Sequence, residues 1–251
     1  MELRYNGSTK DASRARRLRL RLRAVKAIPA VSLLLALVLV YVAALRYPAA
    51  ETMGAGDRPT LVIDPGHGGI DGGALAFDGT RESDINLAIS LKLRDLAQFC
   101  GASVFLTRED DSRRTDILSY SEHEDLVHRT ELINSVPGGV LISIHQNFFP
   151  TSQPSGAQVL YAAGEESRRF GELTHGMLVT QLQPENRRVA APAPMELYIT
   201  SKAACPAILV ECGFLSNLSD LSRLKEDPYQ TQIALILMSS FLQYTSDKTY
   251  T

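Results

Sequence analysis

Apolar and polar positions follow two distinct patterns between residues 60 and 246. Short apolar runs have the length of buried strands, and the longer stretches between them repeat apolar residues every three or four positions, as amphipathic helices do. In the longest early stretch we expect Leu87, Leu91 and Leu96 on the apolar side. The short runs predict strands at residues 61–64, 102–107, 140–144, 159–162 and 207–210, and the longer stretches predict helices at 82–99, 122–134, 165–183 and 228–244. This alternation predicts an α/β domain with a mostly parallel sheet flanked by helices on both faces.

A different pattern precedes this domain. Residues 28–45 form a run of eighteen residues without a charged side chain, which is just long enough to span a bilayer. The positive-inside rule places the arginine-rich residues 1–27 in the cytoplasm and the rest of the chain outside the membrane. We therefore expect a basic cytoplasmic segment (1–27), a transmembrane signal-anchor (28–45), a linker (46–59) and a folded domain (60–246). Small residues after the apolar run leave cleavage open, and we favour an uncleaved, single-pass anchor in the cell membrane.

The charge distribution supports this division and limits the function. Residues 1–26 carry nine Lys and Arg against two acidic residues, a net charge of +7; since the whole chain carries -2, residues 27–251 carry -9. Proteins that bind nucleic acid normally present a basic face, so an acidic domain argues against that class of partner.

A histidine follows the first predicted strand, in the segment from Asp64 to Gly69. Pro65 and Gly66 end the strand, and the glycines around His67 allow a second loop or a ligand to approach the backbone closely. Polar residues just beyond the carboxyl end of a strand lie where open α/β sheets form their sites. Taken alone, a strand-to-loop turn with an incidental histidine explains this segment as well.

Partners for His67 come from distant parts of the chain. The third predicted strand ends at His145, the fifth is followed by Glu211, and Glu82 begins the helix that returns to the sheet after the first strand. Because parallel strands place their carboxyl ends on one edge, we expect these groups to converge. Two imidazoles and one carboxylate are the ligand set of a catalytic zinc with an open position for water. The remaining carboxylate, Glu211, is then available as general base and later as proton donor.

These residues also carry a resemblance to a known family. The chain resembles the zinc-dependent N-acetylmuramoyl-L-alanine amidases, peptidoglycan hydrolases with a single-zinc α/β catalytic domain. The resemblance implies one Zn²⁺ bound by His67, Glu82 and His145, with Glu211 catalytic, in agreement with the argument from strand ends. The matching segments follow the family order and are residues 62–69, Glu82 with 86–88, 106–108, 143–147 and 209–217.

Within that family, residues 186–198, together with 155–158 and Asn217, resemble the membrane-anchored germination or spore-cortex type. The resemblance implies hydrolysis of the amide bond between N-acetylmuramic acid and L-alanine, in cell-wall remodelling or cortex maturation. Only 65 residues separate His145 from Glu211, and the predicted elements fill most of them. We therefore expect an open site or control by an activating protein partner, rather than an inserted blocking helix.

Two other functions remain compatible with the sequence. One is a zinc endopeptidase that cuts within the stem peptide, and the other is a catalytically inactive wall-binding regulator. The endopeptidase differs from the amidase in the bond that it cleaves. An inactive regulator usually lacks a metal ligand or the general base, whereas all four of these positions are filled here.

Further polar residues are candidates for supporting roles. Arg187 and Arg188 are candidate contacts to a carboxylate of the stem peptide, since guanidinium groups suit bidentate capture, and a solvated surface position is equally compatible. Asn147 is a candidate substrate contact or a residue that steadies the His145 loop. Asp64 is expected to contact the His67 ring and orient it toward the metal without binding the metal itself.

The three cysteines and the other three histidines are not expected to take part in the site. Cys100, Cys205 and Cys212 have no metal-like spacing, and each suits a small buried apolar position. A disulfide between Cys205 and Cys212 is disfavoured, because an intervening strand holds them apart. The other three histidines are expected on exposed helix surfaces; they are His123, His128 and His175.

Overall fold

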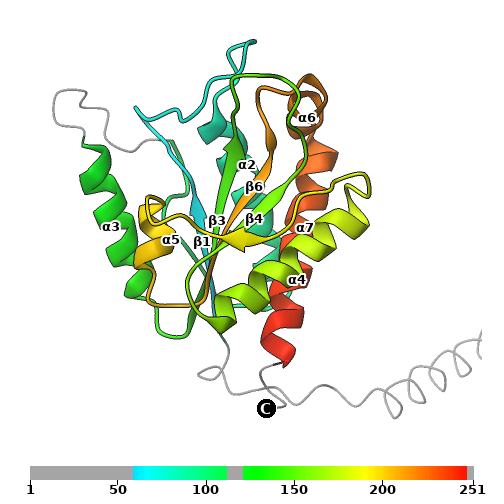
Figure 1. Cartoon of the computed structure of the whole chain (residues 1–251). Helices are drawn as coiled ribbons and strands as arrows, with labels where there is room; N and C mark the ends of the chain where they lie inside the picture. The colour runs from blue at the N-terminus through cyan, green and yellow to red at the C-terminus, as the bar shows by residue number, and fades with distance from the viewer. Residues whose placement is uncertain (1–58, 112–120, 248–251) are drawn as a thin grey trace, which may run out of the picture. The chain divides into compact units, whose positions relative to one another are not determined.

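The computed structural model describes residues 59–111 and 121–247, and a six-stranded sheet forms its centre (Figure 1). The strands are β1 (Thr60–Pro65), β2 (Val104–Leu106), β3 (Gly139–Asn147), β4 (Gln158–Tyr161), β5 (Ala191–Pro192) and β6 (Ala207–Phe214). They lie in the order β2-β1-β3-β6-β4-β5, and every neighbouring pair is parallel except β4 with β6. The predicted mostly parallel sheet is confirmed.

Helices cover both faces of the sheet, as predicted. Helices α2 (Glu82–Phe99), α4 (Glu165–Gln181) and α7 (Asp227–Asp247) pack on the face that carries Ile63, Ile142 and Val210. Helices α3 (Glu122–Asn134) and α5 (Tyr198–Lys202) cover part of the opposite face, and α6 (Leu218–Leu224) follows β6. The short elements β5, α5 and α6 were not among the sequence predictions.

Helix α2 positions the first part of the site. Its fully or nearly buried apolar residues are Ile85, Ile89, Leu93 and Ala97, spaced four apart so that they form one stripe against the sheet and α7. Leu87, Leu91 and Leu96, which we expected on the apolar side, are all half-buried; Leu96 packs against the core, whereas Leu87 and Leu91 lie outside it.

The start of α2 is held by the loop that follows β1. No side chain caps the helix at Arg81. Instead, the main-chain nitrogens of Glu82 and Ser83 donate to the main-chain oxygens of Ala74 (2.9 Å) and Gly72 (3.1 Å). These bonds satisfy N–H groups that a helix start leaves unpaired, and they fix Glu82 relative to the β1–α2 loop.

The predicted basic segment, membrane anchor and most of the linker lie outside the described residues. Within residues 59–111 and 121–247, no helix combines the length and apolar character needed to cross a membrane. The anchor at residues 28–45 stays a prediction.

The cysteine and histidine expectations hold only in part. All three thiols are free, and Cys212 is buried, but Cys100 is exposed at the end of α2. His123 and His128 are exposed, whereas His175 is buried on α4 and its Nε2 lies 2.8 Å from the main-chain oxygen of Arg188. The segment after α4 folds back over this helix face and covers His175.

Candidate metal centre and active site

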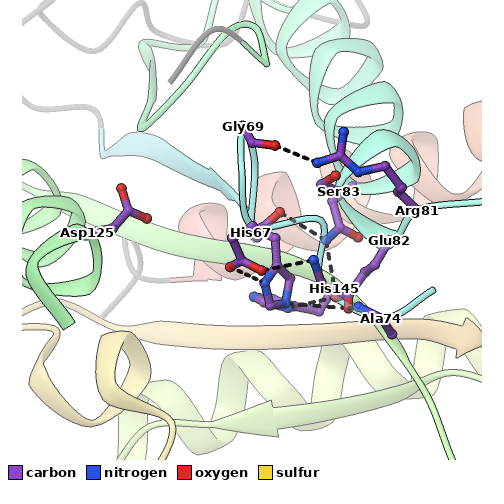
Figure 2. A network of polar contacts seen from close by, with 12 residues as sticks. His67, Gly69, Ala74, Arg81, Glu82, Ser83, Asp125 and His145 are labelled. Carbon is purple, nitrogen blue, oxygen red and sulfur yellow. Dashed lines mark hydrogen bonds and ion pairs between the residues drawn. The ribbon is translucent and has the colours of Figure 1, made fainter. Parts of the chain in front are cut away.

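His67, Glu82 and His145 come together at the carboxyl ends of β1 and β3, with one candidate ligand atom of each within 4.8 Å of the others. The Nε2 atom of His67 lies 3.4 Å from Oε2 of Glu82, and the Nδ1 atom of His145 lies 3.0 Å from Oε1. Figure 2 shows both imidazole rings beside the Glu82 carboxylate. The predicted convergence of these three side chains is therefore present in the structure.

His67 has an unusual backbone conformation. With φ at +61° it is the single non-glycine residue with positive φ among the described residues, a conformation that costs about 1–3 kcal/mol. Its Nδ1 atom lies 2.6 Å from Oδ2 of Asp71. A ring that donates its Nδ1 proton to a carboxylate presents the lone pair of Nε2 to a metal. Asp71 thereby selects the nitrogen of His67 that faces Glu82.

Two arginines hold the main chain around His67. The Arg129 guanidinium donates from Nη2 to the oxygen of His67 (2.6 Å) and from Nη1 to that of Pro65 (2.8 Å). Arg108 donates to the oxygens of Pro65 (2.9 Å) and Gly66 (3.1 Å). These bonds to three consecutive carbonyl groups offset the strain at His67.

The expectation that Asp64 orients His67 directly was wrong. The buried Asp64 carboxylate accepts hydrogen bonds from Thr107 Oγ1 (2.6 Å) and Ser143 Oγ (2.8 Å), and it pairs with Arg129 Nη1 at 3.2 Å. Burial opposes the charge of Asp64, but Arg129 and the two hydroxyl groups more than compensate and lower its pKa. Asp64 therefore acts on His67 through Arg129, and Asp71 makes the direct contact.

Glu82 is buried and held in its charged form. Its Oε2 accepts from the main-chain nitrogen of Ala74 (2.9 Å), and its Oε1 accepts from Gln146 N (3.0 Å) and Asn86 Nδ2 (3.2 Å). Burial raises the pKa of Glu82. The hydrogen bond and charge of His145 lower it by more, so that the pKa falls from its usual value of 4.5 to about 2. A rigid anionic carboxylate between two imidazoles suits a divalent metal ion.

Glu211 lies on the strand next to His145, in direct register with it. Burial raises the pKa of its carboxyl group to about 7, with smaller opposing contributions from the two histidines. Its Oε2 atom is buried and has no hydrogen-bond partner in the described part of the chain. Carboxylates of this kind, with a pKa near neutrality and a free oxygen, suit general acid–base work.

A small hollow of about 50 Å³ lies beside the two histidines, lined by His67, Asp71, Arg129 and His145. This volume is enough for water-sized ligands. The site is thus reachable from the face of the sheet that α3 and α5 partly cover.

The candidate substrate contacts lie on the same edge of the sheet. Arg187 is exposed, whereas Arg188 is half-buried and bonded to Ser155 and Gln158. Asn147 pairs with Phe214 in the sheet, and its main-chain oxygen accepts from Leu215 N at 2.8 Å. Asn147 therefore ties β3 to the end of β6 through its backbone.

Three functional residues had no role assigned from the sequence: Asp71, Asn86 and Arg129. Asp71 precedes two glycines and so resembles an ordinary turn residue. Asn86 follows Glu82 by four positions, a spacing that places both on one helix face and was an available signal. Arg129 is 62 residues from His67, and no local pattern connects the two.

Residues 61–240 match the family model described as N-acetylmuramoyl-L-alanine amidase. A germination-specific N-acetylmuramoyl-L-alanine amidase of Bacillus subtilis is 34% identical over 193 residues, covering 75% of this chain and 80% of the relative. Among solved structures, the CwlD amidase of Clostridioides difficile, in complex with the GerS lipoprotein, has a TM-score of 0.70 and 36% identity, covering 75% of this chain and 98% of that one. The amidase AmiC2 of Nostoc punctiforme has a TM-score of 0.66 and 28% identity, covering 75% and 97%.

Proposed function

The chain belongs to the N-acetylmuramoyl-L-alanine amidase family, and we propose that it uses His67, Glu82 and His145 to bind one zinc ion and Glu211 as its general base. The bond cleaved joins the lactyl carbonyl of N-acetylmuramic acid to the amino group of L-alanine in peptidoglycan. The observation that supports these roles is the convergence of the three potential ligands beside a buried carboxylate with a raised pKa.

The residues present fit a zinc ion. Neutral imidazole nitrogen and carboxylate oxygen are preferred zinc donors, and three protein ligands leave the fourth position open in catalytic sites. Asp71 fixes the tautomer of His67, and the bonds from Asn86 and Gln146 orient the Glu82 carboxylate. When bound, zinc in such a site polarises a carbonyl group and lowers the pKa of a water molecule.

Glu211 then moves the proton. Its free Oε2 accepts a proton from the attacking water, and the same oxygen returns that proton to the nitrogen of the departing L-alanine. His145 and Glu211 are direct neighbours across two parallel strands, so the base lies next to the proposed metal ligands without being one of them. This separation allows metal binding and proton transfer to be tested independently.

The test is zinc-dependent digestion of defined muropeptides by the purified protein, with the products identified by mass. An amidase releases an intact stem peptide with a free L-alanine amino terminus and an intact glycan. Fragments cut inside the stem peptide would instead establish an endopeptidase. Absence of both zinc and cleavage, in zinc-supplemented buffer and with the protein partner added, would count against the amidase function and favour a wall-binding module.

We also propose that residues 28–45 anchor the protein in the cell membrane with the catalytic domain on the cell-wall side. The support is the uncharged run preceded by a segment of net charge +7. Resistance of the full-length protein to alkaline extraction from membranes, with the catalytic domain accessible to protease added outside spheroplasts, is the expected result. A soluble, shortened product would show that the segment is cleaved.

A protein partner is the proposed means of control. The support is the CwlD amidase of Clostridioides difficile, which was solved in complex with a lipoprotein. Full activity and stoichiometric zinc in the purified protein alone would contradict this proposal.

A further inference from the structure

A row of side chains crosses three strands at the proposed active site. His145 on β3 pairs with Glu211 on β6, and Glu211 pairs with Gln158 on β4. Directly paired residues project from the same face of a sheet. Gln158 therefore continues the catalytic row on the side of Glu211 away from the proposed zinc ligands.

An irregularity in β6 adds an aromatic ring to this face. His145 pairs with Glu211, and the next pair along the two strands is Asn147 with Phe214. Between these two pairs, β6 therefore contains one residue more than β3. The extra residue in β6 is a bulge, and it returns Phe214 to the face that carries Glu211, whereas residues three apart in a regular strand face opposite sides.

Arg188 lies on the surface formed by Gln158 and Phe214. Its guanidinium carbon is 4.5 Å from the centre of the Phe214 ring. Its Nη1 donates to Oε1 of Gln158 (3.2 Å), and its Nε donates to the main-chain oxygen of Ser155 (3.1 Å). Among the described residues its Nη2 makes no hydrogen bond, so the group is held in place with donors still available.

The backbone of Arg188 is equally constrained. Its nitrogen donates to Oδ1 of Asn186 (3.0 Å), and its oxygen lies 2.8 Å from Nε2 of the buried His175. A guanidinium group fixed by backbone, stacking and side-chain bonds loses little entropy when an anion binds.

The hollow beside Arg188 is cationic. It has a volume of about 380 Å³ and is lined by Arg187, Arg188 and Arg223, with Glu185, Asn186, Ser155 and Gly156. Arg223 is paired with Asp220 (2.8 Å) and Glu185 (3.7 Å), so the positive charge comes from Arg187 and Arg188. This concentration of guanidinium groups contrasts with the net charge of -9 on residues 27–251. This hollow lies beyond the row formed by His145, Glu211 and Gln158. Its positive charge suits an anionic group of the substrate.

We propose that Arg188 binds the free α-carboxylate of the second stem-peptide residue, D-glutamate, and thereby selects substrates in which this group is not amidated. The inference rests on the proposed amidase function. Neighbouring strands are about 5 Å apart, so Gln158 lies about 10 Å from His145 across the row. An extended peptide advances about 3.5 Å per residue, which puts a carboxylate two residues beyond the scissile carbonyl about 7 Å away, within reach of Arg188.

The experiment compares two disaccharide peptides that differ only at the second residue, one with D-glutamate and one with D-isoglutamine. The full-length, zinc-loaded protein should cleave the D-glutamate substrate with a kcat/KM about tenfold higher or more, as expected for a charged hydrogen bond. Equal kcat/KM values would overturn the inference and leave the amidase function standing. Cleavage of neither substrate would count against the amidase function itself.

Variants assign the preference to one residue. Arg188→Met should reduce the acid-to-amide ratio to about two or less, and Arg188→Lys should retain an intermediate ratio because it keeps the charge without the fork of donors. Each ratio is measured within one protein sample, so a smaller folded fraction does not change it. Arg168→Met is the matched control, since Arg168 lies in an exposed ion-pair cluster on α4 with Glu165 and Glu172.

A wild-type ratio in Arg188→Met would overturn the assignment. So would a loss of the preference in Arg187→Met while Arg188→Met retains it. Zinc content should be the same in all variants, because Arg188 contacts none of the three proposed ligands.

Discussion

Arg129 and His67 are joined by a 2.6 Å hydrogen bond from the guanidinium Nη2 to the main-chain oxygen, although 62 residues separate them in the sequence. The bond links helix α3 to the loop after β1 and holds a left-handed backbone conformation at His67. The same guanidinium pairs with Asp64 and Asp125. The geometry of the first proposed zinc ligand thus depends on a buried charge network that touches none of the metal-binding atoms.

Replacing Asp71 by Asn should weaken zinc binding by about tenfold, because the charged acceptor for His67 Nδ1 is lost while the oxygen that accepts from Gly73 N remains. Competition with a zinc chelator measures the affinity. Asp95→Asn, on the exposed surface of α2, is the control. Equal affinities in the wild type and Asp71→Asn would show that Asp71 does not orient His67.

Replacing Gly66 by Ala should disrupt the metal site. A Cβ atom at this position would lie 2.3 Å from Cε1 and Nε2 of the His145 ring, so the ring has to move. We expect zinc content and muropeptide cleavage to fall together. Gly176→Ala is the control: its Cβ enters open space on α4, and stability should rise by about 0.5–1 kcal/mol. Normal zinc content in Gly66→Ala would contradict the packing of these two residues.

Long, regular elements could be predicted from the sequence. Helix α2 matches its predicted bounds, and so does α3, because charged residues begin both periodic stretches, while Gly101 follows the end of α2 and Asn134 with Ser135 ends α3. The elements that were missed are two, five and seven residues long (β5, α5 and α6). A periodic pattern needs more residues than these segments contain.

The site could be predicted only as far as topology determines it. Parallel strands place their carboxyl ends on one edge, so the convergence of His67, Glu82 and His145 followed from the order of elements. The partner of His67 did not follow from that order. Asp71 and Arg129 reach it through a loop conformation and a long-range approach of α3, and neither leaves a local sequence pattern.

Replacing Glu211 by Gln should leave zinc bound and lower kcat by about 10²–10⁴, the usual contribution of a general base. The amide keeps the size of the side chain but cannot accept the proton from water. Metal analysis and muropeptide digestion of the same sample separate the two properties. Retained cleavage would remove Glu211 from the mechanism, and loss of zinc would indicate that it is a ligand.

Replacing Asp64 by Asn should destabilise the protein in a pH-dependent way. The pKa of Asp64 is lowered in the folded protein from its usual value of 3.8. Its contribution is therefore fully present above about pH 4 and is lost as the pH falls through the lower, folded pKa. Because Asp64→Asn leaves the buried Arg129 without this anion, we expect a loss of about 3 kcal/mol at pH 7. Urea unfolding from pH 7 to pH 3 should show the difference between the two proteins narrowing in acid; a difference that stays constant would show that the charge of Asp64 does not stabilise the fold.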